Sequence, residues 1–167
     1  MSLKERWENF KLWWKYPFLR PRTLTRDKYC SELFSYTLLH LLPEGWLKAF
    51  GIQLCEDLNR ALMCCSKEVR STFRIYDMKE KYGKLQISCN WYTPEINEVL
   101  HKYEKLSQRI CIYCGHKAKW ISKGYILPYC DNCMNKVKNE IKFVSIFKKG
   151  HKYRNNKKYN KRKNRNG

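Results

Sequence analysis

The sequence predicts an α+β protein that is mostly helical: a helical body with a β-hairpin and a C-terminal four-cysteine zinc ribbon, flanked by a basic Trp-rich arm and a basic tail. Apolar residues recur at helical spacing over much of residues 23–108, which predicts amphipathic helices. Between about residues 72 and 91 the spacing changes to alternation, which is typical of a hairpin. Two Cys-x-x-Cys pairs follow and predict the ribbon.

Charge is distributed unevenly along the 167 residues. The formal net charge is +20, from 35 Lys and Arg against 15 Asp and Glu. Residues 23–110 are close to neutral, whereas residues 148–167 hold ten basic side chains and no acidic one. Such an excess predicts a polyanionic partner or a protein with a strongly acidic surface. We therefore divide the chain into a basic arm (1–22), the body (23–108), the ribbon with a closing helix (109–147) and a tail (148–167) that cannot fold when free.

The arm is predicted to form a short amphipathic helix. Ser2 and Glu5 have the spacing of a capping box, and the pattern breaks near Pro17. Its apolar stripe consists of Leu3, Trp7, Phe10 and Trp14. Three interpretations stay open for this Trp-rich face: packing on the protein's own core, stacking on nucleic acid, or lying in a membrane surface. Residues 17–25 are predicted to be an extended basic connector.

Two further helices are predicted in the first half of the body. One begins at Thr25 or Asp27 and ends at Leu42, before Pro43. Its expected buried residues are Leu33, Phe34, Leu38 and Leu41. The other begins at Glu44 and ends at about Ser66. Its apolar stripe is Trp46, Phe50, Leu54, Leu58, Ala61, Leu62 and Cys65, and off that stripe lie Lys48, Glu56, Asp57 and Arg60.

The hairpin turns near Gly83. Phe73, Ile75 and Asp77 share one face of its first strand, and Leu85, Ile87, Cys89 and Trp91 share one face of its second. Its basic residues, which are Arg74, Lys79, Lys81 and Lys84, form either a solvated edge or a binding surface. Thr93 and Pro94 then begin a helix, as an N-cap followed by proline, and it ends at about Gln108.

The zinc ribbon is predicted from Cys111, Cys114, Cys130 and Cys133, with fifteen residues between the two pairs. Four thiolates in two tight pairs satisfy one tetrahedral Zn²⁺ and leave no position for substrate, so the metal is expected to be structural. Gly115 and Pro128 fit the turns. Residues 117–120 and 124–129 are predicted strands, and His116 is expected to contact a thiolate or a phosphate rather than the ion. Met134, Val137, Ile141, Val144 and Phe147 predict a closing helix.

The remaining cysteines, which include Cys30, Cys55, Cys64, Cys65 and Cys89, are expected to be reduced, since their pattern is not that of a disulfide framework. A reducing cytoplasm is therefore the expected compartment. The N-terminal residues lack the features of a signal peptide, and no apolar run is long enough to predict a transmembrane segment.

Nucleic acid is the expected partner, either free or in a ribonucleoprotein complex. RNA or a single strand is favoured over duplex DNA because basic residues alternate with aromatic ones, and no helix-turn-helix or basic-zipper pattern is present. The residues expected to bind phosphates are Lys117, Lys119, Lys123, Arg154, Lys157, Lys158, Lys161, Arg162 and Lys163, and Tyr153 and Tyr159 are expected to stack on bases. No spacing of histidines, carboxylates or glycines indicates catalysis, so we predict that the protein is not an enzyme.

Four stretches over residues 43–133 carry a family resemblance: LPEGWLKAFG, IYDMKEKYGKLQIS, YEKLSQRICIYCGHKA and GYILPYCDNC. They resemble a family of small zinc-ribbon proteins found mainly in bacteriophages and prophages, although Lys84 stands where family members often have a second glycine. The resemblance implies a phage setting and supplies no catalytic residue. In that setting an alternative function is counter-defence, in which the protein inhibits a host nucleic-acid enzyme such as a CRISPR effector by direct binding.

Overall fold

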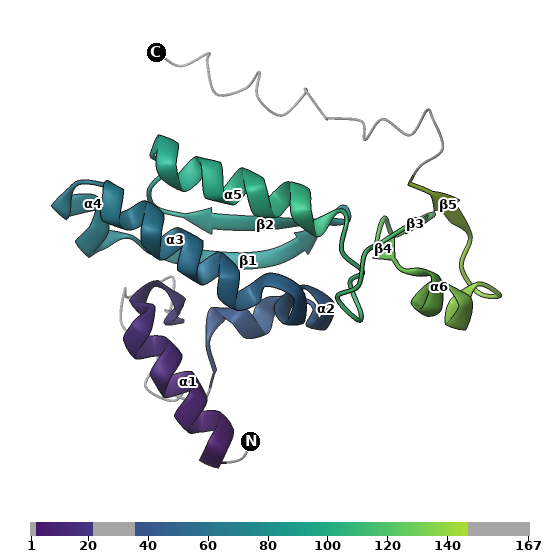
Figure 1. The fold of residues 1–167 in the computed structure, drawn as a ribbon, viewed down its shortest axis with the longest axis horizontal. Coiled ribbons are helices and arrows are strands. Elements are labelled where there is room, and N and C mark those ends of the chain that lie inside the picture. Colours follow the sequence, from purple (N-terminus) through teal and green to yellow (C-terminus); the bar gives the residue numbers. More distant parts are fainter. Residues whose placement is uncertain (1–2, 22–35, 147–167) are drawn as a thin grey trace.

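The computed structural model describes residues 3–21 and 36–146, and it confirms the α+β, mostly helical class (Figure 1). The helical elements are α1 (Leu3–Lys15), η1 (Pro17–Leu19), η3 (Leu38–Leu41), α2 (Glu44–Trp46), η4 (Leu47–Gly51), α3 (Ile52–Cys64), α4 (Lys67–Thr72), α5 (Pro94–Ser107) and α6 (Asp131–Val137). The strands are β1 (Ile75–Lys81), β2 (Lys84–Cys89), β3 (Trp120–Ser122), β4 (Pro128–Tyr129) and β5 (Phe143–Ser145).

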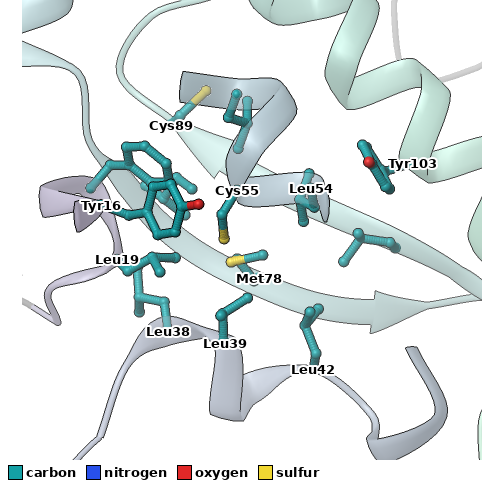
Figure 2. Packing of buried hydrophobic residues seen from close by; sticks show 14 of the residues in the cluster. Tyr16, Leu19, Leu38, Leu39, Leu42, Leu54, Cys55, Met78, Cys89 and Tyr103 are labelled. Carbon is teal, nitrogen blue, oxygen red and sulfur yellow. The ribbon is translucent and has the colours of Figure 1, made fainter. Parts of the chain in front are cut away.

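The body is organised around one helix made of α2, the π-helical turn η4 and α3. Its predicted stripe is confirmed: Trp46, Leu54 and Leu58 are fully buried. α3 packs on α5, α5 packs on β2, and β1 lies against η3. Figure 2 shows the resulting core, in which side chains from all these elements meet around Cys55 and Met78. Because a fully buried large apolar side chain stabilises a fold by about 1.5–3 kcal/mol, this cluster is the main source of stability.

The hairpin forms as predicted, with one shift of register. β1 and β2 pair antiparallel, but a bulge lies between Ile75 and Asp77. The extra residue moves the inward position from Asp77, which was predicted there, to Met78, which is fully buried. A charged residue therefore leaves the packed face and an apolar one takes its place.

The turn of the hairpin holds an unusual backbone conformation. Tyr82 has φ 54° and Gly83 has φ 77°, so both lie in the left-handed region, as a two-residue turn with the twist of a hairpin requires. Glycine adopts this conformation freely, whereas for another residue it costs about 1–2 kcal/mol. The Tyr82 side chain is 68% exposed, so packing does not offset that strain.

The helix that leads to the cysteines is confirmed. Thr93 is its N-cap, and its side chain accepts a hydrogen bond from the Ile96 amide at 3.4 Å. Pro94 occupies the first helical position, where no amide donor is needed. Ile96 and Tyr103 are fully buried against the body, which places the end of α5 beside the start of the metal-binding segment.

The arm is helical, but it packs through a different face from its Trp-rich stripe. Trp13 and Tyr16 are buried, and the Trp13 indole donates to the carbonyl of Tyr36 at 3.1 Å. Trp7, Phe10 and Trp14 are exposed, Trp14 by 77%. The arm therefore packs on the core of the protein, but the predicted stripe of Trp7, Phe10 and Trp14 faces away from that core.

Two predictions in the first forty residues are changed by the structure. Residues 17–19 are not extended: they form the 3₁₀ turn η1, which buries Phe18 and Leu19. Over residues 38–41 the second predicted helix is the 3₁₀ helix η3, in which Leu38 is buried and Leu41 is exposed. The backbone of Thr37 and Leu42 is extended, so the predicted helix is wrong on both sides of η3. Residues 22–35, with Leu33 and Phe34, lie outside the described residues.

The predicted closing helix is wrong beyond Val137. α6 ends there, and β5 instead pairs antiparallel with β3, placing Val144 opposite Ile121. The Phe143 ring packs edge-on against Tyr129 at 5.0 Å between centroids. Val144 is β-branched and Phe143 is aromatic, and both residue types favour strands. The edge of β3 offers backbone hydrogen bonds that another strand can form and a helix cannot.

Asp57 was predicted only to lie off the apolar stripe, yet it is 6% exposed and joins α3 to α5. It accepts hydrogen bonds from the Tyr103 hydroxyl at 2.8 Å, from the Lys102 ammonium at 2.5 Å, and from Gln53 and Arg60. Burial by itself raises the pKa of Asp57, but these donors outweigh it and hold the pKa below its usual value. The carboxylate is therefore a structural joint between the two helices.

We expect Asp57→Asn to lower the free energy of unfolding by about 2–3 kcal/mol, because the charged acceptor of several donors is lost. A depressed folded-state pKa stabilises the protein above the unfolded pKa of about 4 and loses that contribution as the pH falls. Urea unfolding measured between about pH 6 and pH 3 should therefore show that the free energy of unfolding falls more steeply with decreasing pH in wild type than in the variant. Asp77→Asn, at a half-exposed ion pair with Lys79, is the control. Equal slopes for wild type and Asp57→Asn would contradict this assignment.

Candidate metal centre

The four predicted cysteines converge on one point. The sulfur atoms of Cys111, Cys114, Cys130 and Cys133 all lie within 4.8 Å of one another, and those of Cys114 and Cys130 are 3.4 Å apart. A tetrahedral ion with metal–sulfur bonds of about 2.3 Å needs sulfurs about 3.8 Å apart. The cluster has the size and the donor set to hold one metal ion.

The first cysteine pair lies on a tight turn that glycine makes possible. Gly115 has φ 81°, and its amide donates to the Cys111 carbonyl at 3.1 Å. The Cys111 amide in turn donates to the His116 carbonyl at 2.7 Å. These bonds turn Cys111 and Cys114 toward the same side.

The second pair lies at the start of α6. Cys130 is the N-cap of that helix, and its sulfur accepts a hydrogen bond from the Cys133 amide at 3.5 Å. The strand β4 before it is buried and pairs with β3 through Trp120 and Tyr129. Ribbon strands were predicted over residues 117–120 and 124–129. The observed β3 begins at Trp120, and β4 is confined to Pro128 and Tyr129.

Thiol acidity distinguishes one cysteine of this cluster, Cys130, from the core cysteines, whereas burial raises the pKa of Cys114 and of Cys133 as it does in the core. Burial raises the pKa of the Cys55 thiol to about 12, and it also raises that of Cys89. Burial has the same effect on Cys130, but the Cys133 backbone amide and the neighbouring thiols outweigh it and lower the pKa of Cys130. A metal ligand must lose its proton, whereas a packing residue keeps it.

His116 lies beside the cluster, as expected, without completing it. Its Nδ1 is 3.4 Å from the Cys114 sulfur, and its side chain is exposed. With four sulfurs available to the ion, the imidazole acts as a hydrogen-bonding neighbour of a ligand. The alternative that it contacts phosphate stays a prediction.

The first cysteine turn is seated directly on the start of the long helix. The Gly45 amide donates to the Ile112 carbonyl at 2.9 Å, and the Trp46 indole donates to the Ile110 carbonyl at 3.1 Å. A Cβ atom on Gly45 would lie 2.2 Å from the Cys111 carbonyl oxygen and 2.7 Å from the Gly115 nitrogen. The glycine is therefore needed because two backbones touch here.

The basic residues predicted to bind phosphates differ in their surroundings. Lys117 and Lys123 are exposed. Lys119 forms an ion pair with Asp131, whose other oxygen accepts from the Trp120 indole at 2.8 Å. Lys119 also lowers the pKa of Asp131. The tail residues of the prediction lie outside the described residues: Tyr153, Arg154, Lys157, Lys158, Tyr159, Lys161, Arg162 and Lys163.

Three residues that position the centre were not singled out from the sequence. Asp131 and Trp120 brace α6 against β3, and Gly45 receives the cysteine turn. Asp131 could have been found, since an acidic residue directly after an N-capping cysteine is favourable at a helix start. Gly45 could also have been noticed. A glycine in the first turn of a predicted helix weakens that helix, so its presence there indicates that close packing requires it.

The fold and the cluster together define a mostly helical α+β protein with a cluster of four cysteines that could hold a metal ion. In comparisons with known proteins, no family model, no curated protein and no solved structure matches the chain. Within the described ranges, no helix combines the length and apolar character needed to cross a bilayer. The resemblance to phage zinc-ribbon proteins stays a prediction.

We expect Gly45→Ala to destabilise the protein by more than about 2 kcal/mol, although the same change inside an ordinary helix stabilises the helix by about 1 kcal/mol. The reason is the backbone contact with Cys111 and Gly115. Gly51→Ala is the control, because its Cβ would meet only the end of the Leu47 side chain, at 2.8 Å. Urea unfolding and chelator competition measure both effects. Equal behaviour of the two variants would show that the contact is unimportant.

We expect Cys130→Ser to remove the bound metal and to unfold residues 109–146, because metal binding and local folding are linked. Metal analysis of purified protein should find about one equivalent in wild type and much less in the variant. In hydrogen exchange, the backbone amides of residues 109–146 should lose protection in the variant, while those in the core of α3 and α5 stay protected. Cys64→Ser, at an exposed cysteine outside the cluster, is the control. A metal-free Cys130→Ser protein with wild-type protection would contradict this role.

Proposed function

We propose that this chain is a non-catalytic zinc protein that binds nucleic acid, with RNA or single strands preferred. The observation that carries the proposal is the concentration of basic residues at positions 148–167. Ten basic and no acidic residues fill positions 148–167, while the body is nearly neutral. A segment of that composition attracts polyphosphate by counterion release.

Zinc is the metal that the donor set favours. Four thiolates in tetrahedral arrangement suit Zn²⁺ or an iron–sulfur cluster, and the ribbon spacing is that of structural zinc sites. All four positions of the ion are taken by sulfur, so water and substrate have no access to it. The ion would therefore act as a clamp for the ribbon and not as a reaction centre.

Ion pairs within the body and the ribbon engage some of their basic residues, which supports assigning phosphate binding to the basic residues that are in excess. Glu104 bonds to Lys84, Asp57 to Lys102 and Asp131 to Lys119. Exposed lysines such as Lys117 and Lys123 add to the charge of the ribbon. Since exposed ion pairs contribute about 0–1 kcal/mol, phosphate can also compete for Lys119.

The setting of this function follows from the thiols and from the resemblance. Cysteine ligands must be reduced to hold zinc, so the cytoplasm of a host cell is the proposed compartment. The resemblance to phage and prophage proteins supports a gene that is carried by a mobile element. A ribonucleoprotein complex of the host, or a host protein with an acidic surface, is then the proposed natural target.

We expect affinity for a labelled single-stranded RNA 20-mer to fall steeply with salt, with a log–log slope that shrinks when residues 148–167 are deleted. Lys157→Glu with Lys158→Glu should reduce the magnitude of the slope by about 1–2 and leave the fold intact. Lys67→Glu with Lys105→Glu makes the same change of charge on exposed positions of the body and is the control. A salt-independent affinity, or equal loss in both double variants, would contradict the proposal.

Purification from infected cells, with and without nuclease, separates binding from inhibition. Mixed nucleic acid that nuclease removes is the expected result. A stoichiometric complex with one host enzyme that survives nuclease would instead support the counter-defence alternative.

A further inference from the structure

The hairpin turn and the ribbon loop carry exposed tyrosines that packing does not explain. Tyr82 is held in a left-handed conformation with φ 54° while most of its side chain is in solvent. Asn or Gly is the residue that this position of a two-residue turn favours. Strain retained at an exposed aromatic residue points to a role outside folding.

The turn is in direct contact with the ribbon. A Cβ on Gly83 would lie 2.5 Å from the Ile126 carbonyl oxygen, so the backbone of the turn touches the loop between β3 and β4. In Figure 1 the turn end of the hairpin accordingly faces the part of the chain that carries β3 and β4. Tyr82 and Tyr125 are each one residue from this contact, so their Cα atoms are within about 14 Å of each other.

Tyr125 is displayed by a braced loop. Ser122 is buried, its hydroxyl accepts from the Leu127 amide at 3.1 Å, and it donates to the Tyr125 carbonyl. The backbone of the loop is thus held at both ends, while the Tyr125 side chain is 83% exposed. The backbone that carries this ring does not need to be ordered again when the ring binds a ligand.

Three lysines lie near the two tyrosines along the chain or through a backbone hydrogen bond. Lys81 precedes Tyr82, Lys123 lies two residues before Tyr125, and the Lys123 amide donates to the Lys142 carbonyl at 2.7 Å. All three lysine side chains are exposed. The nearby acid Glu80 is engaged by the turn itself, since its carboxylate accepts from the Gly83 amide at 2.6 Å.

We propose that Tyr82 and Tyr125 form a stacking platform for unpaired bases of RNA or single-stranded DNA, with Lys81, Lys123 and Lys142 binding the phosphates between them. This inference rests on the nucleic-acid function proposed above and locates a base-contacting site on the folded body. Two separately supported aromatic faces bordered by cations match the alternation of bases and phosphates in a single strand. Bases paired in a duplex are stacked on one another and cannot reach such rings.

The test compares Tyr82→Asn, Tyr125→Ser and the double variant on two probes: a labelled single-stranded 20-mer and an abasic strand of the same length. Each single change should weaken binding to the base-containing strand about 5- to 100-fold and leave the abasic strand unaffected. Tyr82→Asn should also raise the Tm by about 2–5 °C, because it relieves the turn. Tyr76→Ser, at an exposed tyrosine of β1 distant from the turn, is the control.

The outcomes separate this inference from the function on which it rests. If wild type binds neither probe, both ideas fail. If wild type binds and the tail deletion weakens it, but the tyrosine variants bind both probes normally, only the platform is overturned. Equal loss on both probes would also overturn stacking, because the abasic strand offers no base. A protein complex that Tyr82→Asn disrupts, with unchanged strand affinity, would assign this surface to a protein and overturn the proposal.

Discussion

The structure depends on the backbone contact between the first cysteine turn and the start of the long helix. Gly45 leaves room for the Cys111 carbonyl, and its amide bonds to Ile112. The Trp46 indole, fully buried, bonds to the Ile110 carbonyl, 64 residues further along the chain. The residue that begins the core stripe is thus the one that holds the metal-binding turn. The start of the core stripe and the first cysteine turn are therefore held together by the same few contacts.

Polar groups inside the body serve to join its helices. Asp57 on α3 is bonded to Tyr103 and Lys102 on α5, and Ser107 at the end of α5 accepts from the Leu85 amide of β2 at 2.8 Å. Each bond links elements that apolar packing brings together but does not orient, since apolar contacts have no direction. The end of α5 is fixed by these bonds, and the end of α5 sets where Cys111 begins. The cysteine cluster is therefore positioned in part by a buried carboxylate and a buried hydroxyl that lie outside it.

Features that depend on local patterns could be predicted from the sequence, and those that depend on distant partners could not. The long helix, the Thr93 cap and the four cysteines follow from spacing over a few residues. The bulge that turns Met78 inward, the strand at Phe143 and the burial of Asp57 each depend on a partner far along the chain. The arm shows the same limit: its stripe predicted an amphipathic helix, yet Trp13 on another face is the residue that packs. Periodicity finds a face, and tertiary contacts decide which face is buried.

Among the described parts of the chain that leave aromatic residues in solvent, three are the outer face of α1, the hairpin turn and the ribbon loop. Exposed aromatic side chains forgo the stabilisation of burial, about 1.5–3 kcal/mol each, and Tyr82 adds backbone strain to that loss. The same chain buries Trp46 and Tyr103 completely, so its fold is able to shelter large rings. Two of the three parts, the turn and the loop, touch each other because the metal-binding ribbon is docked on the body. The cysteine cluster joins the two ends of the ribbon segment, so it helps to keep the ribbon loop against the hairpin turn, although it is not part of that contact.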